Sequence, residues 1–519
     1  DVVDDRPVRP ILAAACFALV AAGLDPPILD PSMPSIQAAI RSEPQIQSLL
    51  LVTALWKAAV LLAGGVIADI FRSNRMLTLG LIGLVVASAL AIIVPDGPAF
   101  LASRLMATLS VGIVIPFVVG AVGSSYSGIK RATAIGIAYA ALAAGSALAA
   151  PLALLNGVNG PFTAAFVVCG VTAAIAALGT WRLLPPMPHA PLSQRPLILA
   201  TALWAFGVTA IVAALINFRI DALDVLVAAV GLAAIVIATL SLRRRGFTGI
   251  SRIELRPVAI VLAVGIVLGF AQIVPLIKLP QYFVVVQGLP PIVATAAIAP
   301  FVVALLIAGP VSGWLLQRVG PRLLIGGGVA AVGAADLLLA AILWPDTNYV
   351  LFIVPFVLIG AGFVIATVVR TSLIFASVPK QLPGTAAALN EASLGLGSRL
   401  GVVFSTAIVT QVALRTYADA LVGQPAEEIA RRLEPLREIL FALGLPEFPE
   451  LLELIESQAR ADYVDAALAG ARVAFIVPGV LAIITGVVAF VALGRRGPMR
   501  TVWEHMDERV AIPDPASTD

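Results

Sequence analysis

Six ionisable side chains lie inside long apolar stretches of the sequence, where charged residues are rare. They are Asp25, Lys57, Arg104, Asp336, Glu391 and Arg399. In the middle of a membrane-spanning helix, a charged side chain costs at least about 2.5–3.5 kcal/mol on insertion scales. Residues retained at that cost are candidates for binding a charged ligand or, where they are carboxyl groups, for carrying a proton.

The carboxyl groups of Glu391 and Asp25 are the leading candidates. A carboxyl group that exchanges its proton near neutral pH can carry that proton in one direction and attract a cation in the other. In the alternative interpretation each is permanently paired, Asp25 with Arg104 and Glu391 with Arg399. The second pair is eight residues apart, which is about 12 Å along a helix, so we expect no direct contact between them. Asn390, next to Glu391, is a further candidate for the same site.

The other residues that could do chemistry exclude several classes of protein. The two histidines and two cysteines form no metal-ligand spacing and no disulfide framework. We find no Gly-rich phosphate loop followed by Lys and no His–Asp or Ser–His pair suited to catalysis. The net charge of +3 is too diffuse for a nucleic-acid-binding surface. The sequence therefore predicts no metal, no cofactor, no nucleic-acid partner and no enzymatic activity.

The stretches that hold the six side chains have the length and composition of membrane-spanning helices. Hydrophobic residues make up 60% of the 519-residue chain and charged residues 12%, against about 45–50% and 25% in soluble domains. Apolar blocks of about 20 residues match a hydrocarbon core of about 30 Å, and their lack of alternation excludes a barrel. We therefore expect an all-α polytopic membrane protein with fourteen spans, at 11–30, 48–69, 76–95, 99–122, 132–154, 162–184, 196–217, 225–242, 257–279, 291–316, 322–344, 349–371, 384–411 and 473–494.

The distribution of Lys and Arg predicts the orientation, because loops on the cytoplasmic side are enriched in these residues. With both termini in the cytoplasm, 21 basic residues fall in inner segments, Arg370 among them. The short outer loops hold three, which are Arg41, Arg219 and Lys278. The long segment 412–472 is expected outside despite its arginines, since the rule weakens for long loops. We expect a multi-pass protein of the cell (inner or plasma) membrane.

A weak internal repeat suggests how the chain is divided. The sequence from Gly65 to Asp69, at the end of the second expected span, is echoed from Gly313 to Gln317 at the end of the tenth. Transporters are commonly built from such repeats, with the ligand site at their interface near the bilayer midplane. The expected boundaries are 1–186 for an N-terminal six-helix half, 187–256 for an inserted two-helix hairpin with a basic inner loop, 257–494 for a C-terminal six-helix half with outer loop 412–472, and 495–519 for a cytoplasmic tail.

The first expected span carries a sequence that resembles a known family signature. The stretch from Leu24 to Ile36 is similar to l-D-x-T-v-v-n-v-A-L-P-x-I, a pattern of the fourteen-span drug:proton antiporters in the major facilitator superfamily. Asp25, Pro34 and Ile36 fit this pattern, while Pro27 and Asp30 replace its Thr and Asn.

Two further motifs strengthen the resemblance to that branch. In the fifth span, Gly136, Gly145 and Pro151 are similar to the antiporter motif G-x8-G-x3-G-P, in which small residues allow close helix packing. In the thirteenth span, Glu391 with Gly397 and Gly401 matches E-x5-G-x3-G of the quaternary-ammonium efflux pumps.

The turns after the second and tenth spans resemble the superfamily motif G-x-x-x-D-R-x-G-R-K, which in the family latches the inner side of the two halves. In this sequence Ile70 and Arg72 stand where the motif has Arg and Gly, and Gln317 replaces the Asp of the second copy. The resemblance implies an inner-side latch made of Gly65, Asp69, Arg72, Arg75, Gly313, Gln317, Arg318, Gly320 and Arg322.

The resembled fold also implies where the intramembrane charges lie. Arg104 matches a fourth-span Arg that the superfamily associates with proton coupling. Asp336 falls on an equivalent of a peripheral helix, where we expect an interhelical hydrogen bond. The charges expected on cavity-lining helices are Asp25, Lys57, Arg104, Glu391 and Arg399.

The resemblance implies a secondary transporter that exports hydrophobic or amphipathic, often cationic, compounds by proton antiport and alternating access. Its expected partners are a small substrate, protons and membrane lipid, and we expect it to work as a monomer. One alternative is a lipid or amphipathic-metabolite exporter of the same fold, because Lys57 makes the cavity charges mixed. A more remote alternative is a membrane sensor that transports nothing.

Overall fold

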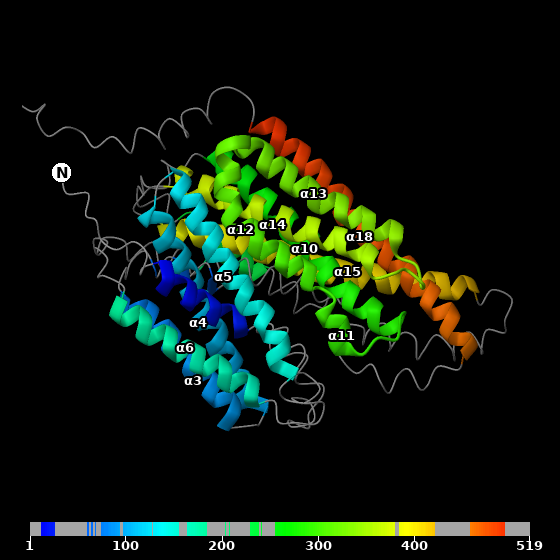
Figure 1. Cartoon of the computed structure of the whole chain (residues 1–519), viewed down its shortest axis with the longest axis horizontal. Helices are drawn as coiled ribbons and strands as arrows, with labels where there is room; N and C mark the ends of the chain where they lie inside the picture. Colours follow the sequence, from blue (N-terminus) through cyan, green and yellow to red (C-terminus); the bar gives the residue numbers. More distant parts are fainter. Residues whose placement is uncertain are drawn as a thin grey trace, which may run out of the picture.

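The computed structural model is built from long helices that lie side by side (Figure 1). It describes residues 12–25, 60–61, 64–65, 68, 74–93, 97–126, 128–154, 163–183, 203, 207, 229–237, 240, 255–378, 383–420 and 457–493. Within these ranges, ten helices are long and apolar enough to cross a membrane, and a shorter apolar helix covers Leu12–Asp25. The described part of the chain holds no strand. The prediction of an all-helical polytopic membrane protein is confirmed.

The helix boundaries follow the apolar blocks closely, with differences at a few ends. The helices are α3 (Asn74–Ile93), α4 (Gly97–Ser125), α5 (Gly128–Leu154), α6 (Thr163–Leu183), α10 (Leu255–Val285), α11 (Pro291–Ala296), α12 (Ala299–Val319), α13 (Pro321–Ile342), α14 (Val350–Ser377), α15 (Pro383–Ala420) and α18 (Ser457–Ala492).

The expected span 291–316 is broken into α11 and α12 because of a proline. A new helix begins at Ala299, and Pro300 occupies its first turn, where the missing N–H of proline costs no hydrogen bond. Helices α15 and α18 both continue into the segment 412–472, which we predicted as an outer loop. Part of that segment is therefore helical.

The count of fourteen spans remains a prediction. Most of the expected spans 48–69, 196–217 and 225–242 lies outside the described residues. The inserted hairpin 187–256 and the domain boundaries that depend on it also remain predictions.

Two buried cations correct the assignment of loops. Arg370 was counted in an inner loop and Lys278 in an outer one, but Arg370 lies inside α14 and Lys278 inside α10, and both are buried. Each of these cations lies one residue before the end of an expected span, 349–371 or 257–279, whereas α14 continues through Leu373 and Ile374 to Ser377. Removing one residue from each side leaves the direction of the charge bias unchanged.

The helices form two groups that meet along a few helices. In the first group, α3 packs against α4 and α6, and the helix 12–25 packs against α5 through Gly145, which faces the Val20 carbonyl. In the second group, α10 packs on α15, α12 on α14, and α13 on both α14 and α18. Helices α5 and α12, and α4 and α15, join the groups, which are blue to cyan and green to red in Figure 1.

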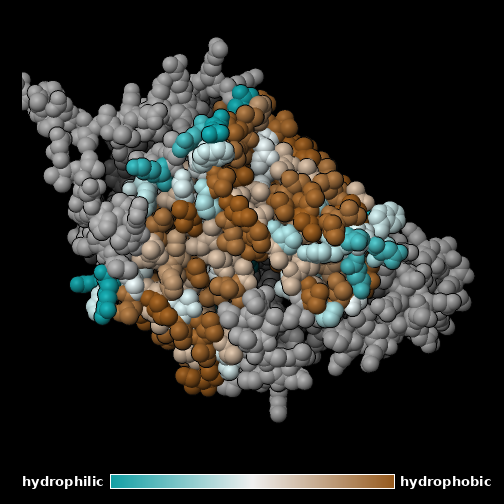
Figure 2. All heavy atoms as spheres, viewed as in Figure 1, coloured by the Kyte–Doolittle hydropathy of each residue, from teal (hydrophilic) through white to brown (hydrophobic). Residues whose placement is uncertain are grey.

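The outer surface of the helices is apolar. Large side chains such as Ile93, Trp181, Ile307 and Val354 are more than half exposed, and Figure 2 shows hydrophobic residues over much of the visible helical surface. In water such a surface would be unfavourable, whereas lipid chains solvate it without cost. This arrangement is the one expected of helices surrounded by a bilayer.

Candidate functional site

A cluster of polar side chains is buried where α5, α14 and α15 meet. Its centre is Glu391 of α15, whose Oε1 accepts a hydrogen bond from the Tyr139 hydroxyl of α5. The Asn390 Nδ2 donates to the Tyr139 oxygen at 2.7 Å and to Glu391 Oε1 at 3.2 Å. We call Tyr139, Arg370, Asn390, Glu391 and Ser393 the Glu391 cluster.

Arg370 supplies the positive charge of this cluster from α14. Its guanidinium is fully buried and donates from Nη1 to the Ser393 hydroxyl at 2.6 Å and from Nη2 to the Asn390 carbonyl at 3.3 Å. Arg370 and Glu391 also attract each other electrostatically. A carboxylate that has lost part of its hydration is stabilised by nearby positive charge and by hydrogen bonds; here Arg370 supplies the charge, and Tyr139 and Asn390 supply the hydrogen bonds.

The space for this guanidinium is made by a glycine of α10. A Cβ atom on Gly265 would overlap Arg370 Nη1 and the Ser393 hydroxyl, and would lie 2.8 Å from Arg370 Cζ. Any larger residue at 265 must displace either the guanidinium or the helix.

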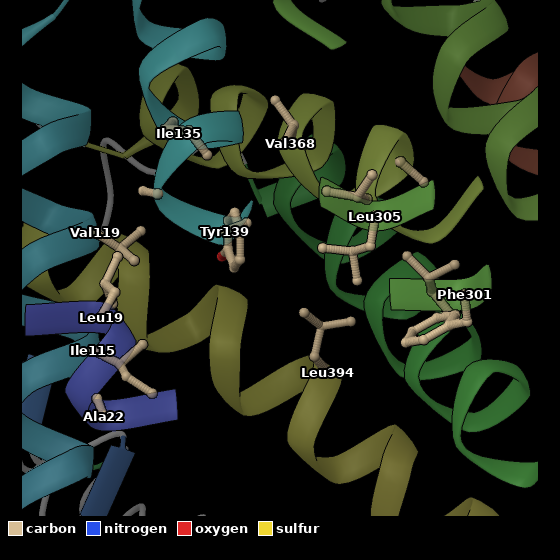
Figure 3. Packing of buried hydrophobic residues seen from close by; sticks show 14 of the residues in the cluster. Leu19, Ala22, Ile115, Val119, Ile135, Tyr139, Phe301, Leu305, Val368 and Leu394 are labelled. Atoms are coloured by element: carbon tan, nitrogen blue, oxygen red, sulfur yellow. The ribbon is translucent and has the colours of Figure 1, made fainter. Parts of the chain in front are cut away.

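Tyr139 of α5 reaches Asn390 and Glu391 of α15, and Figure 3 shows it among the buried side chains of the region, which include Leu305 of α12 and Leu394 of α15. The sequence motifs indicated Glu391 and Asn390, but they did not indicate Tyr139, Arg370 or Gly265. The only sequence signal for Arg370 was the apolar sequence on both of its sides.

Next to the Glu391 cluster, α5 and α12 approach through glycines. The helix-packing residue Gly136 faces the Gly309 carbonyl, and a Cβ on Gly309 would lie 2.7 Å from the Gly136 oxygen. Gly313, which we assigned to the latch, packs on Thr133 of α5, with 2.7 Å between its ideal Cβ and the Thr133 nitrogen. Pro151 lies near the other end of α5.

Further contacts between the two groups lie toward the same ends of the helices. An ideal Cβ on Gly120 would lie 3.1 Å from the Pro383 carbonyl oxygen, and one on Gly123 would lie 2.5 Å from the Phe375 ring. Gly65 packs directly against the backbone of Gly384. We call the end formed by Ser125, Gly128, Val319, Ser377 and Pro383 the contact end.

Asp25 and Arg104 form a second buried charged site, separate from the Glu391 cluster. Arg104 Nη1 lies 2.9 Å from Asp25 Oδ1, with side chains 3% and 7% exposed. The guanidinium also lies 4.7 Å from the centre of the Phe166 ring and 5.6 Å from that of Phe100, where cation–π attraction adds to the ion pair. This geometry matches the paired alternative that the sequence left open.

The residues predicted to form the inner-side latch make separate contacts with different parts of the structure. Arg318 lies over the Trp314 ring at 4.3 Å, and Arg322 donates from Nε to the Phe490 carbonyl at 2.6 Å. Gly320 joins α12 to α13 with φ of 83°, a conformation that glycine adopts without strain. Gln317 and Arg75 are exposed, and the remaining latch positions Asp69 and Arg72 lie outside the described residues, as does Lys57.

Asp336 lacks the interhelical hydrogen bond that we predicted. The side chain is fully buried on α13, and neither carboxyl oxygen has a hydrogen-bond partner. A charged carboxylate buried without a partner is very costly, so we infer that Asp336 is neutral.

The substitution Asp336→Asn tests this, because an amide has nearly the shape of a neutral carboxyl group. We expect the free energy of unfolding to change by less than about 1 kcal/mol, measured by titration with SDS in mixed micelles. A loss of several kcal/mol would instead indicate that Asp336 is ionised and paired.

Comparison with known proteins agrees with this architecture. Residues 13–402 match the Major Facilitator Superfamily. The chain therefore belongs to the Major Facilitator Superfamily, a family of membrane transport proteins rather than enzymes.

Relatives with assigned activities are drug-resistance proteins. The chain is 26% identical over 448 residues to the multidrug efflux pump LfrA of Mycolicibacterium smegmatis, covering 83% of this chain and 86% of LfrA. It is 25% identical over 464 residues to the methyl viologen resistance protein SmvA of Salmonella typhimurium, covering 84% and 89% of the two chains. The sequence resemblance to a drug-efflux branch is thus confirmed.

Solved structures agree on the fold. The proton:xylose symporter XylE matches with a TM-score of 0.61 and 14% identity over 95% of this chain and 96% of XylE. The human organic anion transporter MFSD10 matches with a TM-score of 0.60 and 14% identity over 93% and 99% of the two chains.

Proposed function

We propose that this protein is a proton-coupled antiporter that exports hydrophobic or amphipathic, often cationic, compounds from the cell. The observation that carries the proposal is the placement of Glu391, a half-buried carboxyl group at the junction of the two helix groups. The names of LfrA and SmvA, a multidrug pump and a viologen resistance protein, support this substrate class over a lipid.

The proposed exchange uses one carboxyl group for two ligands. Glu391 takes up a proton when the site faces outward, and it releases this proton when a cationic substrate enters from the cytoplasm. Tyr139 and Asn390 stabilise the carboxylate by hydrogen bonds, and Arg370 keeps the cluster close to neutral. Alternation between the two charge states then couples substrate export to proton entry.

The charge bias supports an orientation for this cycle. We propose that both termini are cytoplasmic in an inner or plasma membrane, which puts the contact end on the cytoplasmic side. The helix groups would then be closed inward, and the described conformation would be the one that faces outward.

Transport by reconstituted protein tests the role of Glu391. With Glu391→Gln in proteoliposomes, we expect uptake of a cationic dye to lose its acceleration by an imposed pH gradient, because glutamine holds no exchangeable proton. The matched control is Asp346→Asn, which removes an exposed carboxyl group between α13 and α14 and should leave the acceleration unchanged. Gradient-driven transport that survives Glu391→Gln would overturn the proposal, while competition by lipids instead of cations would favour a lipid exporter.

A further inference from the structure

The hydrogen bond between Tyr139 and Glu391 connects the two helix groups. Tyr139 belongs to α5 in the first group, and Glu391 belongs to α15 in the second. Tyr139 lies one helical turn from Gly136, where α5 touches α12. A change in this bond therefore acts directly on the surface that holds the groups together.

The donors and acceptors fix the direction of this bond. Asn390 Nδ2 donates to the Tyr139 oxygen at 2.7 Å, so the Tyr139 hydroxyl is free to donate its own proton to Glu391 Oε1. The same Oε1 accepts from Asn390 Nδ2 at 3.2 Å. Two donors that converge on one carboxyl oxygen are the environment of an ionised carboxylate.

We propose that Tyr139 is the residue through which protonation of Glu391 opens the contact end. The inference rests on the proposed function of Glu391 as the proton carrier. A hydrogen bond to an ionised acceptor is roughly twice as strong as one between neutral groups. The connection between α5 and α15 is therefore strong while Glu391 is ionised, and it weakens when a proton arrives. In this role Tyr139 is a positioning residue that needs no contact with substrate.

Weakening of the Tyr139–Glu391 hydrogen bond on protonation opens the contact end at the step where an exporter needs it open. Proton loss from Glu391 strengthens the connection and closes the contact end, so that substrate leaves on the opposite side. Proton uptake from that side weakens the connection, and the contact end opens to the cytoplasm for the next substrate. A transporter with the opposite sign would open inward only after losing its proton.

No other charge pair described for the residues around Glu391 links the two helix groups as the Tyr139–Glu391 hydrogen bond does. Arg370 attracts Glu391, but α14 and α15 belong to the same helix group, so this attraction does not hold the groups together. Arg104 is bound to Asp25, Arg131 donates to the Tyr126 carbonyl, and Arg472 donates to the Leu343 carbonyl. Among described side chains, the charges other than Glu391 on α15 and on the helices beside it are Arg104, Lys130, Arg131, Lys278, Arg370, Arg399 and Arg472.

Distances between spin labels in the full chain test the proposal. Labels attached after Arg182→Cys and Leu323→Cys report on exposed positions of α6 and α13 toward the contact end, in a background with Cys16→Ser and Cys169→Ala. On acidification through the range in which a carboxyl group titrates, we expect the population to move from the shorter to the longer distance. With Tyr139→Phe, we expect most of this shift to be lost, because the longer distance is already populated at alkaline pH.

The control is Tyr349→Phe, which removes a hydroxyl that donates to the Ala297 carbonyl at 2.9 Å away from the cluster. This variant should keep the full shift. If Tyr139→Phe also keeps it while Glu391→Gln abolishes it, the role of Tyr139 is refuted and the proton carrier stands. If Glu391→Gln keeps the shift, the carrier is another group, and both proposals fail.

Discussion

Replacing Arg104 with leucine is expected to lower the free energy of unfolding by about 3–5 kcal/mol, the usual cost of leaving one member of a buried ion pair without its partner. Asp25 would remain 7% exposed with its charge uncompensated. The stacking of the guanidinium on Phe166 and Phe100 would be lost as well. The measurement is SDS titration in mixed micelles, followed by helical circular dichroism.

A double variant separates the ion pair from any further role of its members. Asp25→Asn combined with Arg104→Gln removes both charges, so we expect it to recover the part of the loss that comes from the uncompensated charge of Asp25, but not the part that comes from ring stacking. If the double variant is stable and still transports, the pair is structural. A stable double variant without transport would contradict this and would give Asp25 or Arg104 a part in binding substrate or protons.

The second large effect is expected from Gly265→Ala, a change of one methyl group. The new Cβ would overlap Arg370 Nη1, so the guanidinium has to leave Ser393 and Asn390 or α10 has to move away. Because a displaced guanidinium no longer compensates the charge of Glu391, we expect the loss of gradient-driven transport to be comparable with that of Arg370→Leu; a shift of α10 alone would leave that charge in place.

Two comparisons show whether this loss acts through Arg370. Gly327→Ala is the matched control, since an ideal Cβ on Gly327 meets nothing within 4 Å, and it should transport normally. In a chain that already carries Arg370→Leu, Gly265→Ala should add little, because the two changes remove the same interaction. Fully additive losses would show that Gly265 matters for helix packing alone.

The sequence predicted the helical class and the intramembrane charges because both depend on local composition. An apolar block long enough to cross a bilayer needs no knowledge of its neighbours, and Glu391, Asp25 and Arg104 are conspicuous within such blocks. The pairing of Asp25 with Arg104 was one of the two alternatives that the sequence left open, and their similar depth in the membrane was the ground for it. Pro300 carried a local signal for the break before α12, although the expected span ran through it.

The partners of Glu391 could not be predicted in the same way. Tyr139 is 252 positions away, and one tyrosine in a span gives no sign of which helix it faces. Arg370 was counted with the inner loop because it lies one residue before the end of the expected span 349–371. Its burial depends on hydrogen bonds to α15 and on the missing side chain of Gly265. Such compensation becomes visible only when three helices are placed together.

The glycine surface between α5 and α12 has a consequence for turnover. Gly136 and Gly309 meet through backbone atoms, and Gly313 meets the hydroxyl and the backbone of Thr133. Helices joined by interlocking large side chains must change rotamers and lose side-chain freedom each time they close. Helices that meet through bare backbone avoid most of that cost, so the barrier to parting and rejoining is low. In the proposed transport cycle, this surface would favour repeated opening and closing of the contact end over one tight and lasting closure.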